Sequence, residues 1–264
     1  MSMNIDLTSQ TAVVFGAGRG IGQSIALELA KAGATVYIAD LILDNCEGVK
    51  KDLIALGYKA EAVAVDVSSY DQVDAVLEKA ESETGRLDIV VNNAGIVTLG
   101  SFLDTTPEEI NKLINVNLIG ANNGCQAAIK RMKKYNQGKI VNTSSFAGRR
   151  ALKAGFGHYG MTKAGVIYLT QAAAFAGADH NINVNSVCPG IIRSAMWESI
   201  LDAYEDGGAD REASWKESLK TFIPLARGDQ KAEDIAYTVM FLCSPYANHI
   251  TGQALNVDGG ASMD

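Results

Sequence analysis

A tyrosine and a lysine four positions apart form the first candidate catalytic pair in this chain. They are Tyr159 and Lys163, in a stretch of helical character. Residues four apart lie on one face of a helix, so the Lys163 ammonium can lie beside the Tyr159 phenol. An unperturbed tyrosine has a pKa of about 10, and a nearby positive charge favours the phenolate. The pair therefore predicts a general base that works near neutral pH.

A second chemical signal is a glycine-rich run that follows an apolar stretch and opens a helical one. Residues 16–22 read Gly-Ala-Gly-Arg-Gly-Ile-Gly. Glycines let a backbone turn tightly against a pyrophosphate, and free amides at a helix start favour its negative charge. Asp40 ends the next apolar run, 18 positions after Gly22, a spacing that suits hydrogen bonds from adenosine ribose hydroxyls. The run predicts a dinucleotide site, and a tight turn with a solvated aspartate is the alternative.

Two residues near this loop favour different nicotinamide dinucleotides. With NADP, Asp40 would lose ribose hydrogen bonds of about 1.5 to 3 kcal/mol and repel the 2′-phosphate by about 1 to 4 kcal/mol. Arg19 can attract that phosphate, but an exposed ion pair contributes only about 0 to 1 kcal/mol. We therefore expect the cofactor to be NAD.

The elements that must position these residues follow an alternating pattern of βα units, typical of a parallel sheet in an α/β fold. Short β-branched runs predict strands at residues 11–15, 35–39, 60–65, 87–91, 139–143, 183–188 and 254–257. Helical periods predict helices at residues 20–32, 43–56, 70–84, 107–135, 158–180 and 231–242. No proline-rich or Gly/Ser-rich linker divides the chain, so we expect one domain over residues 1–264.

One stretch, at about residues 194–220, interrupts this alternation. Two helical patterns, 196–204 and 211–220, flank Glu-Asp-Gly-Gly at 205–208. They carry the aromatic residues Trp197, Tyr204 and Trp215. This favours a substrate lid beyond the carboxyl ends of the strands, where open α/β sheets bind ligands. An ordinary pair of surface helices is the alternative.

Composition and charge exclude several classes of partner. The 264 residues carry a net charge of −7 with no basic stripe, which disfavours nucleic acid and anionic membrane surfaces. Residues 1–10 are too polar for a signal peptide, and the longest uncharged helical stretch, 164–178, is too short to span a bilayer. We therefore expect a cytoplasmic protein. The four cysteines are far apart, so we expect reduced core residues and no metal site.

Taken together, these motifs resemble those of the short-chain dehydrogenase/reductase family along nearly the whole chain. In chain order the matching residues are Gly16, Gly20 and Gly22; Asp66-Val67; Asn92-Asn93-Ala94-Gly95; Asn117; Ser144-Ser145; Tyr159 and Lys163; Pro189-Gly190-Ile191; and Val257-Asp258-Gly259-Gly260. The resemblance implies a doubly wound Rossmann-type domain with a seven-stranded parallel sheet in the order 3-2-1-4-5-6-7 and helices on both faces.

The resemblance also implies roles for individual residues. The catalytic tetrad would be Asn117, Ser145, Tyr159 and Lys163: Tyr159 transfers the proton, Ser145 steadies the substrate oxygen, Lys163 binds the nicotinamide ribose and lowers the Tyr159 pKa, and Asn117 holds a relay water. A NAD site would comprise Gly16, Gly18, Arg19, Gly20, Ile21, Gly22, Asp40, Leu41, Asp66, Val67, Asn93, Ala94, Gly95, Val116, Tyr159, Lys163, Pro189, Gly190, Ile191 and Ser194. The substrate pocket would include Ser145, Ala147, Met196 and Trp197.

The chain departs from the family pattern at three places. Phe15 occupies the position before the first glycine, where the family usually has a threonine whose hydroxyl bonds to neighbouring backbone. Ser194 replaces the threonine that is common after Pro189-Gly190. Ser145 precedes Tyr159 by 14 positions, one more than we expect, whereas Ser144 precedes it by 15. We choose Ser145 because the following Phe-Ala-Gly matches the family's run after this strand.

Several residues keep a second interpretation. Asn117 can instead be a packing residue inside a helix, and Asn92 is more readily structural than a ligand. His158 next to Tyr159 lies on a different helical face, so a surface or packing role is favoured over proton transfer. Arg149 and Arg150 can meet an anionic substrate, but a solvated or subunit-contact pair is favoured.

These observations and the resemblance lead to one main function and two alternatives. The main expectation is an NAD-dependent dehydrogenase that interconverts a small secondary alcohol, diol or polyol and its ketone. The alternatives are a 3-oxoacyl-thioester (acyl-carrier-protein) reductase, which Asp40 disfavours because reductive biosynthesis normally uses NADPH, and a catalytically idle NAD-binding regulator. The resemblance further implies a homotetramer built on helices 107–135 and 158–180 and on the C-terminal strand.

Overall fold

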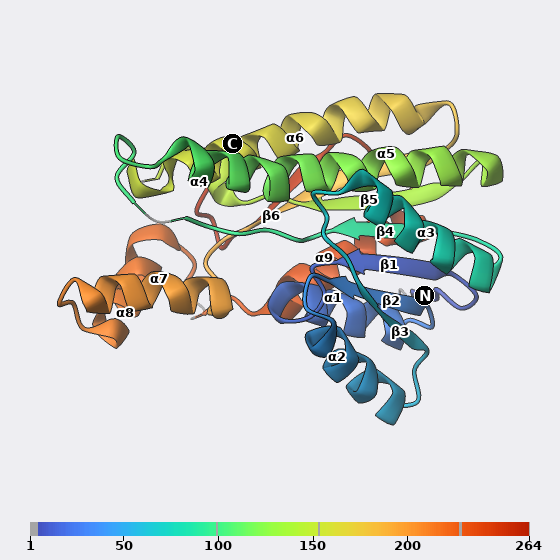
Figure 1. The fold of residues 1–264 in the computed structure, drawn as a ribbon, viewed down its shortest axis with the longest axis horizontal. Helices are drawn as coiled ribbons and strands as arrows, with labels where there is room; N and C mark the ends of the chain where they lie inside the picture. Colours follow the sequence, from blue (N-terminus) through green and yellow to red (C-terminus); the bar gives the residue numbers. More distant parts are fainter. Residues whose placement is uncertain (1–4, 99, 153, 227–228, 264) are drawn as a thin grey trace.

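A parallel sheet runs through the middle of the molecule. The computed structural model describes residues 5–98, 100–152, 154–226 and 229–263, so the first four residues of the polar start lie outside the described residues. Within these ranges seven strands occur: β1 (Thr11–Phe15), β2 (Thr35–Asp40), β3 (Ala60–Ala64), β4 (Ile89–Asn92), β5 (Gly138–Thr143), β6 (Ile182–Pro189) and β7 (Ala254–Val257). They pair in parallel in the order β3-β2-β1-β4-β5-β6-β7 (Figure 1), which confirms the expected sheet.

The central strands read as continuous apolar runs because both faces of the sheet are covered. Along β1, Ala12 and Val14 belong to the core on one face, and Val13 and Phe15 belong to the core on the other. A polar residue at any of these positions would therefore lie in a core.

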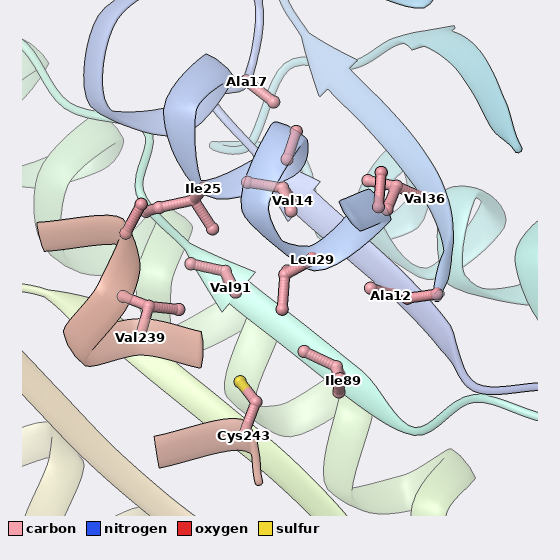
Figure 2. Close-up of a cluster of buried hydrophobic side chains, with 14 of the residues drawn as sticks. Ala12, Val14, Ala17, Ile25, Leu29, Val36, Ile89, Val91, Val239 and Cys243 are labelled. Atoms are coloured by element: carbon pink, nitrogen blue, oxygen red, sulfur yellow. The ribbon is translucent and has the colours of Figure 1, made fainter. Parts of the chain in front are cut away.

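Helices pack on both faces of the sheet. One face carries α1 (Gly20–Lys31), α2 (Leu43–Ala55) and α9 (Ala232–Cys243). Figure 2 shows side chains of α1 and α9 meeting the strands there, with Ile25 and Leu29 close to Val91. The other face carries α3 (Tyr70–Thr84), α5 (Gly120–Met132) and α6 (Gly157–Ala178).

The long helix expected at residues 107–135 is wrong as a single element. The structure divides it into α4 (Pro107–Leu113), a π-helical segment (Ile114–Ile119), α5 and a short 3-10 turn (Lys133–Tyr135). The widened segment contains Asn117, whose side chain bonds to the backbone of Ile96 outside the helix. We attribute the local change of helix type to this contact, since π-turns accommodate groups that break the regular ladder.

Two helices project at one end of the molecule, beside the carboxyl ends of the strands (Figure 1). They are α7 (Ala195–Asp206) and α8 (Arg211–Phe222), each slightly longer than expected. Their inner sides join a cluster made of Phe146, Ile191, Leu201, Trp215 and Ala261, all buried. The aromatic side chains of α7 and α8 therefore pack these two helices onto the rest of the chain.

None of the described helices combines the length and the apolar character needed to cross a membrane.

Candidate active site

The glycine loop after β1 is built from close backbone approaches. A Cβ atom on Gly22 would lie 2.0 Å from the Gly16 carbonyl oxygen, and one on Gly16 would lie 2.6 Å from Ala94 Cα. Gly16 also has φ +74°, in the left-handed region that glycine tolerates. The Gly16 and Ala17 amides both donate to the Ala39 carbonyl, at 2.7 and 3.2 Å. The turn is thus held by backbone bonds, without the hydroxyl that Phe15 replaces.

Asp40 lies at the end of β2, directly beside this loop. Its Oδ2 accepts a hydrogen bond from the Gly18 amide at 3.1 Å, and its Oδ1 accepts one from the Ile42 amide at 3.4 Å. The start of α1 follows, where Arg19 is the N-cap residue and makes no side-chain capping bond. Amides of the first helical turn therefore remain available for an anionic group. A glycine cradle, an uncapped helix start and a neighbouring carboxylate fit a dinucleotide.

The other residues expected around the cofactor come together at the same edge of the sheet. Asn93 Nδ2 donates to the Gly16 carbonyl at 2.9 Å. The Cβ of Ser194 lies 4.0 Å from the Cβ position of Gly20, so the start of α7 reaches the glycine loop. Gly95 packs near Lys163 Nζ, and the Gly190 amide donates to the Val257 carbonyl. The remaining members of the expected cofactor site differ in exposure: Val67, Pro189 and Ile191 are buried, Ile21, Asp66, Ala94 and Val116 are partly buried, and Arg19 and Leu41 are exposed.

Tyr159 and Lys163 lie on the first turns of α6, as their spacing predicts. Lys163 Nζ is 5.8 Å from the centroid of the Tyr159 ring. The lysine side chain is buried and donates a hydrogen bond to the Thr143 carbonyl at the end of β5, at 2.8 Å. The pair is therefore assembled, but the ammonium points to a backbone oxygen of the sheet.

Burial is the main cause of the pKa shifts of Tyr159 and Lys163. Desolvation raises the pKa of Tyr159 to about 12, and a hydrogen bond with Ser145 opposes that rise. Burial lowers the pKa of Lys163 to about 8. Ser145 favours the phenolate, whereas Lys163 Nζ donates to the Thr143 carbonyl, so the lowering of the Tyr159 pKa by Lys163 stays a prediction.

The structure distinguishes the two neighbouring serines. Ser145 interacts with Tyr159, and its Oγ accepts a hydrogen bond from the Ala147 amide at 3.1 Å. Ser144 Oγ donates to the Lys163 carbonyl at 2.8 Å, inside the protein. This geometry supports Ser145 as the member of the tetrad and gives Ser144 a role in holding α6 against the sheet.

Asn117 is buried and joins three parts of the site. Its Oδ1 accepts from the Ile96 amide at 2.8 Å, and its Nδ2 donates to the Ile96 carbonyl at 2.9 Å and to Thr162 Oγ1 at 3.1 Å. These bonds tie the chain after β4 to α6. Asn117 is thus more than a packing residue, and its expected contact with a relay water stays a prediction.

The structure shows the surroundings of the residues for which the sequence allows two roles. Asn92 is buried and donates to Asn142 Oδ1 at 2.8 Å, which confirms its structural role. His158 stacks on Phe102 with ring centroids 4.6 Å apart, which supports the packing role. The two arginines differ: Arg150 is exposed, whereas Arg149 donates to Asn256 and to the Ala254 carbonyl. Treating them as one solvated or subunit-contact pair is therefore wrong.

The expected substrate pocket lies where α7 and the loop after β5 meet. Ala147 is buried, and Met196 and Trp197 are partly buried. The Trp197 ring is 5.6 Å from the Trp215 ring in an edge-to-face contact and 6.5 Å from that of Phe156. Trp197 therefore connects α7 both to α8 and to the segment that precedes Tyr159.

Two contributors to the site were missed by sequence reasoning. The Thr143 carbonyl accepts from Lys163, and Thr162 accepts from Asn117 while donating to the Tyr159 carbonyl at 2.8 Å. Thr143 acts through its backbone, which its residue type does not indicate. Thr162 precedes Lys163 directly, and its hydroxyl inside a helical pattern was the available signal.

Comparison with known proteins gives a consistent result. Residues 16–262 match the family described as enoyl-(acyl carrier protein) reductase. The chain is 39% identical over 256 residues to the 3-oxoacyl-[acyl-carrier-protein] reductase FabG of Staphylococcus aureus, covering 97% of this chain and 99% of that relative. It is 36% identical over 260 residues to a diacetyl reductase [(S)-acetoin forming] of Staphylococcus epidermidis, covering 96% and 98%.

A solved structure agrees with these relatives. The crystal structure of a short-chain type dehydrogenase/reductase from Mycobacterium marinum is similar with a TM-score of 0.90 and 33% identity, covering 99% of this chain and 98% of that one.

Proposed function

Because the chain belongs to the short-chain dehydrogenase/reductase family and is an oxidoreductase, we propose that it interconverts a small secondary alcohol, diol or polyol and its ketone with NAD(H). The proposal rests on the assembled Ser145, Tyr159 and Lys163 together with Asp40 beside the glycine loop. The relative named as a diacetyl reductase supports a small ketone as substrate.

The choice of NAD follows from the position of Asp40. Its carboxylate is held against the glycine loop by the Gly18 amide, at the place where an adenosine ribose would lie. A carboxylate there accepts hydrogen bonds from ribose hydroxyls and repels a 2′-phosphate. Arg19 is exposed, and an exposed cation compensates weakly for that repulsion.

The proton chemistry belongs to this chain's own residues. Tyr159 Oη removes the proton from the substrate hydroxyl during oxidation and returns it during ketone reduction. Ser145 Oγ donates to the substrate oxygen where negative charge develops, which lowers the barrier. Bound NAD would supply the other half of the reaction, by accepting the carbinol hydrogen as hydride.

The remaining members hold this arrangement. Lys163, buried between α6 and β5, would bind the ribose next to the nicotinamide. Asn117 keeps the chain after β4 in place against α6 through Ile96 and Thr162. Trp197, which packs on the aromatic cluster, and the partly buried Met196 would provide an apolar wall that accepts the carbon skeleton and excludes water.

A coenzyme-reduction screen tests the proposal. We expect NADH formation from at least one class among diols, polyols, cyclic alcohols and hydroxysteroids, with kcat/KM at least about tenfold higher for NAD than for NADP. Asp40→Ala should reduce this preference. A preference of the unmodified protein for NADP would contradict the assignment of Asp40.

A 3-oxoacyl-thioester reductase is the second candidate, because the FabG relative shares 39% identity over nearly the whole chain. It is distinguished by assaying acetoacetyl thioester reduction with NADH and NADPH side by side. Efficient reduction of the thioester with NADPH would favour this candidate. Tight NADH binding without turnover in either screen would instead favour a catalytically idle regulator.

We also propose the homotetramer that the family resemblance implies. The outer side of α6 exposes Tyr168 and Phe175, at 74% and 85% of their surfaces, which supports burial of this helix in an assembly. Light scattering at micromolar concentration should give four times the mass of 28.0 kDa, and a monomer would contradict this.

A further inference from the structure

The loop after β5 carries Ser145 and continues as a short 3-10 turn, Phe146–Gly148. The strand pairing extends to Ser144, whose amide donates to the Val187 carbonyl of β6 at 2.8 Å. Beyond this bond the chain leaves the sheet, so the direction of Ser145 depends on what holds the following residues. The amides of Gly148 and Arg149 donate back into the turn, to the carbonyls of Ser145 and Phe146.

One side of this loop rests on α6. A Cβ atom on Gly148 would lie 2.6 Å from the Lys163 carbonyl carbon, and one on Gly160 would lie 2.8 Å from the Ala147 carbonyl oxygen. The loop is therefore in backbone contact with the helix turns that carry Tyr159 and Lys163. Such contact limits how far the loop can move toward the helix but does not prevent it from moving away.

The other side of the loop is held by the Arg149 side chain, which reaches across β6 to β7. Its Nε donates to Asn256 Oδ1 at 3.1 Å, and an Nη donates to the Ala254 carbonyl. The Cys188 thiol is a further hydrogen-bond partner of this guanidinium. Cys188 and Asn256 are direct neighbours in the β6–β7 register, so one guanidinium spans both strands.

Asn256 is itself oriented by the end of the chain. Its Nδ2 donates to the Ser262 carbonyl at 2.9 Å, and Asp258 accepts from the amides of Gly260 and Ser262. Arg149 therefore connects the loop after Ser145 to an ordered C-terminal turn. A planar guanidinium with several donors suits this bridging of separate acceptors, which a lysine reproduces poorly.

We propose that Arg149 is a positioning residue that holds the loop from Ser145 to Arg150 between α6 and β7, so that Ser145 faces Tyr159. The inference rests on the proposed function for its kinetic consequence only. The Arg149 side chain bonds to β7 and acts on the reaction only by positioning Ser145. Arg150, next to it, is exposed.

Hydrogen exchange tests the positioning without any need for a substrate. We compare Arg149→Met, Asn256→Ala and the matched control Arg150→Met with the unmodified full chain. Amides of residues 144–150 and of the first turns of α6 should exchange faster in the first two variants, with unchanged protection elsewhere and with Arg150→Met like the parent. Unchanged exchange in Arg149→Met, or faster exchange spread over the whole sheet, would overturn the proposal.

Kinetics adds a readout that a merely structural residue would not alter. In Arg149→Met we expect kcat to fall about tenfold to a hundredfold, as for small misplacements of catalytic groups. The apparent pKa of the kcat/KM profile for oxidation, which reports the free enzyme, should rise, because Ser145 no longer favours the Tyr159 phenolate. The Kd for NADH should stay within about twofold.

The kinetic outcomes separate this inference from the proposed function. An unmodified protein without turnover contradicts the proposed function, and the exchange experiment then decides on Arg149 by itself. If the parent is active and Arg149→Met has the same pH profile, Arg149 does not position Ser145. The proposed function would then be unaffected.

Discussion

The cofactor side and the lid side of this molecule are held together in different ways. Around the glycine loop the contacts involve the backbone of the loop: Gly16 and Ala17 donate to the Ala39 carbonyl, and the side chains of Asp40 and Asn93 bond to backbone atoms of Gly18 and Gly16. In the lid they run from side chain to side chain: Trp197 packs edge-to-face on Trp215, and α7 and α8 are joined by ion pairs.

This difference explains why one side is easier to interpret than the other. Backbone contacts need only glycine at the closest approaches, and they reproduce the same cradle wherever that pattern occurs. Side-chain contacts depend on every residue that lines them, and a single methylene in a pocket changes discrimination by about 1 to 3 kcal/mol. The cofactor is thus easier to predict than the substrate.

The largest effect is expected at Ser145, which interacts with Tyr159. Ser145→Ala should lower kcat about 10²-fold to 10³-fold, because a donor to the developing charge is lost. Ser144→Ala should keep measurable turnover and lose about 1 kcal/mol of stability, since its hydroxyl bonds to the Lys163 carbonyl. Steady-state kinetics and thermal unfolding measure both, and the reverse ranking would exchange the two assignments.

On the cofactor side, Gly22→Ala should cost about 3 kcal/mol of folding free energy and most of the NADH affinity. The reason is the 2.0 Å separation between the added Cβ and the Gly16 carbonyl oxygen. Gly48→Ala in α2 is the matched control, because nothing lies within 4 Å of its added Cβ. The control should gain about 0.5 to 1 kcal/mol. Equal stabilities of the two variants would show that the close backbone approach at Gly22 does not constrain the loop.

The buried Lys163 should make stability depend on pH. Its pKa falls from 10.5 to about 8 on folding, so the unfolded chain binds more protons between these values. Stability should therefore rise with pH across this interval, by about 3 kcal/mol from this residue. Denaturant unfolding of Lys163→Met should lack this rise. If the parent and the variant show the same pH dependence, the ammonium is not desolvated as described.

On the lid side, Trp197→Ala should act on the substrate and not on the cofactor. We expect KM to rise about tenfold because the ring contacts with Trp215 and Phe156 are lost. The Kd for NADH should stay within about twofold. Leu56→Ala, which removes an exposed apolar side chain outside the lid, is the control. A change in NADH binding equal to the change in KM would show that the two sides are not separable.

The smallest effect is expected from the ion pairs on the outer surface of the lid. Arg211 bonds to Glu198, Asp202 and Glu205 across α7 and α8. Solvent screens such pairs strongly, so Arg211→Gln should lower the unfolding free energy less than Trp197→Ala does. Salt should reduce the difference from the parent. A larger loss would mean that these pairs, and not the aromatic cluster, hold the lid.

Local sequence patterns were sufficient to predict the strands and most helices, and to predict the positions of residues that act together within one helix. The strands were expected within one or two residues of their observed ends, because buried parallel strands are apolar on both faces. The spacing of Tyr159 and Lys163 places them together because four residues is about one helical turn. The glycine loop and Asp40 could also be predicted from the sequence, since the loop follows β1 and Asp40 ends β2, and these two strands are neighbours in the sheet.

Contacts between segments far apart in the chain could not be predicted from local patterns and are defined by the folded structure. The π-helical segment at Asn117 requires the backbone of Ile96, and the orientation of Lys163 requires the carbonyl of Thr143. The distinct roles of Arg149 and Arg150 require β7, more than one hundred residues later. A sequence specifies residue types and short-range periods, whereas these contacts depend on how strands and helices are registered against one another after folding.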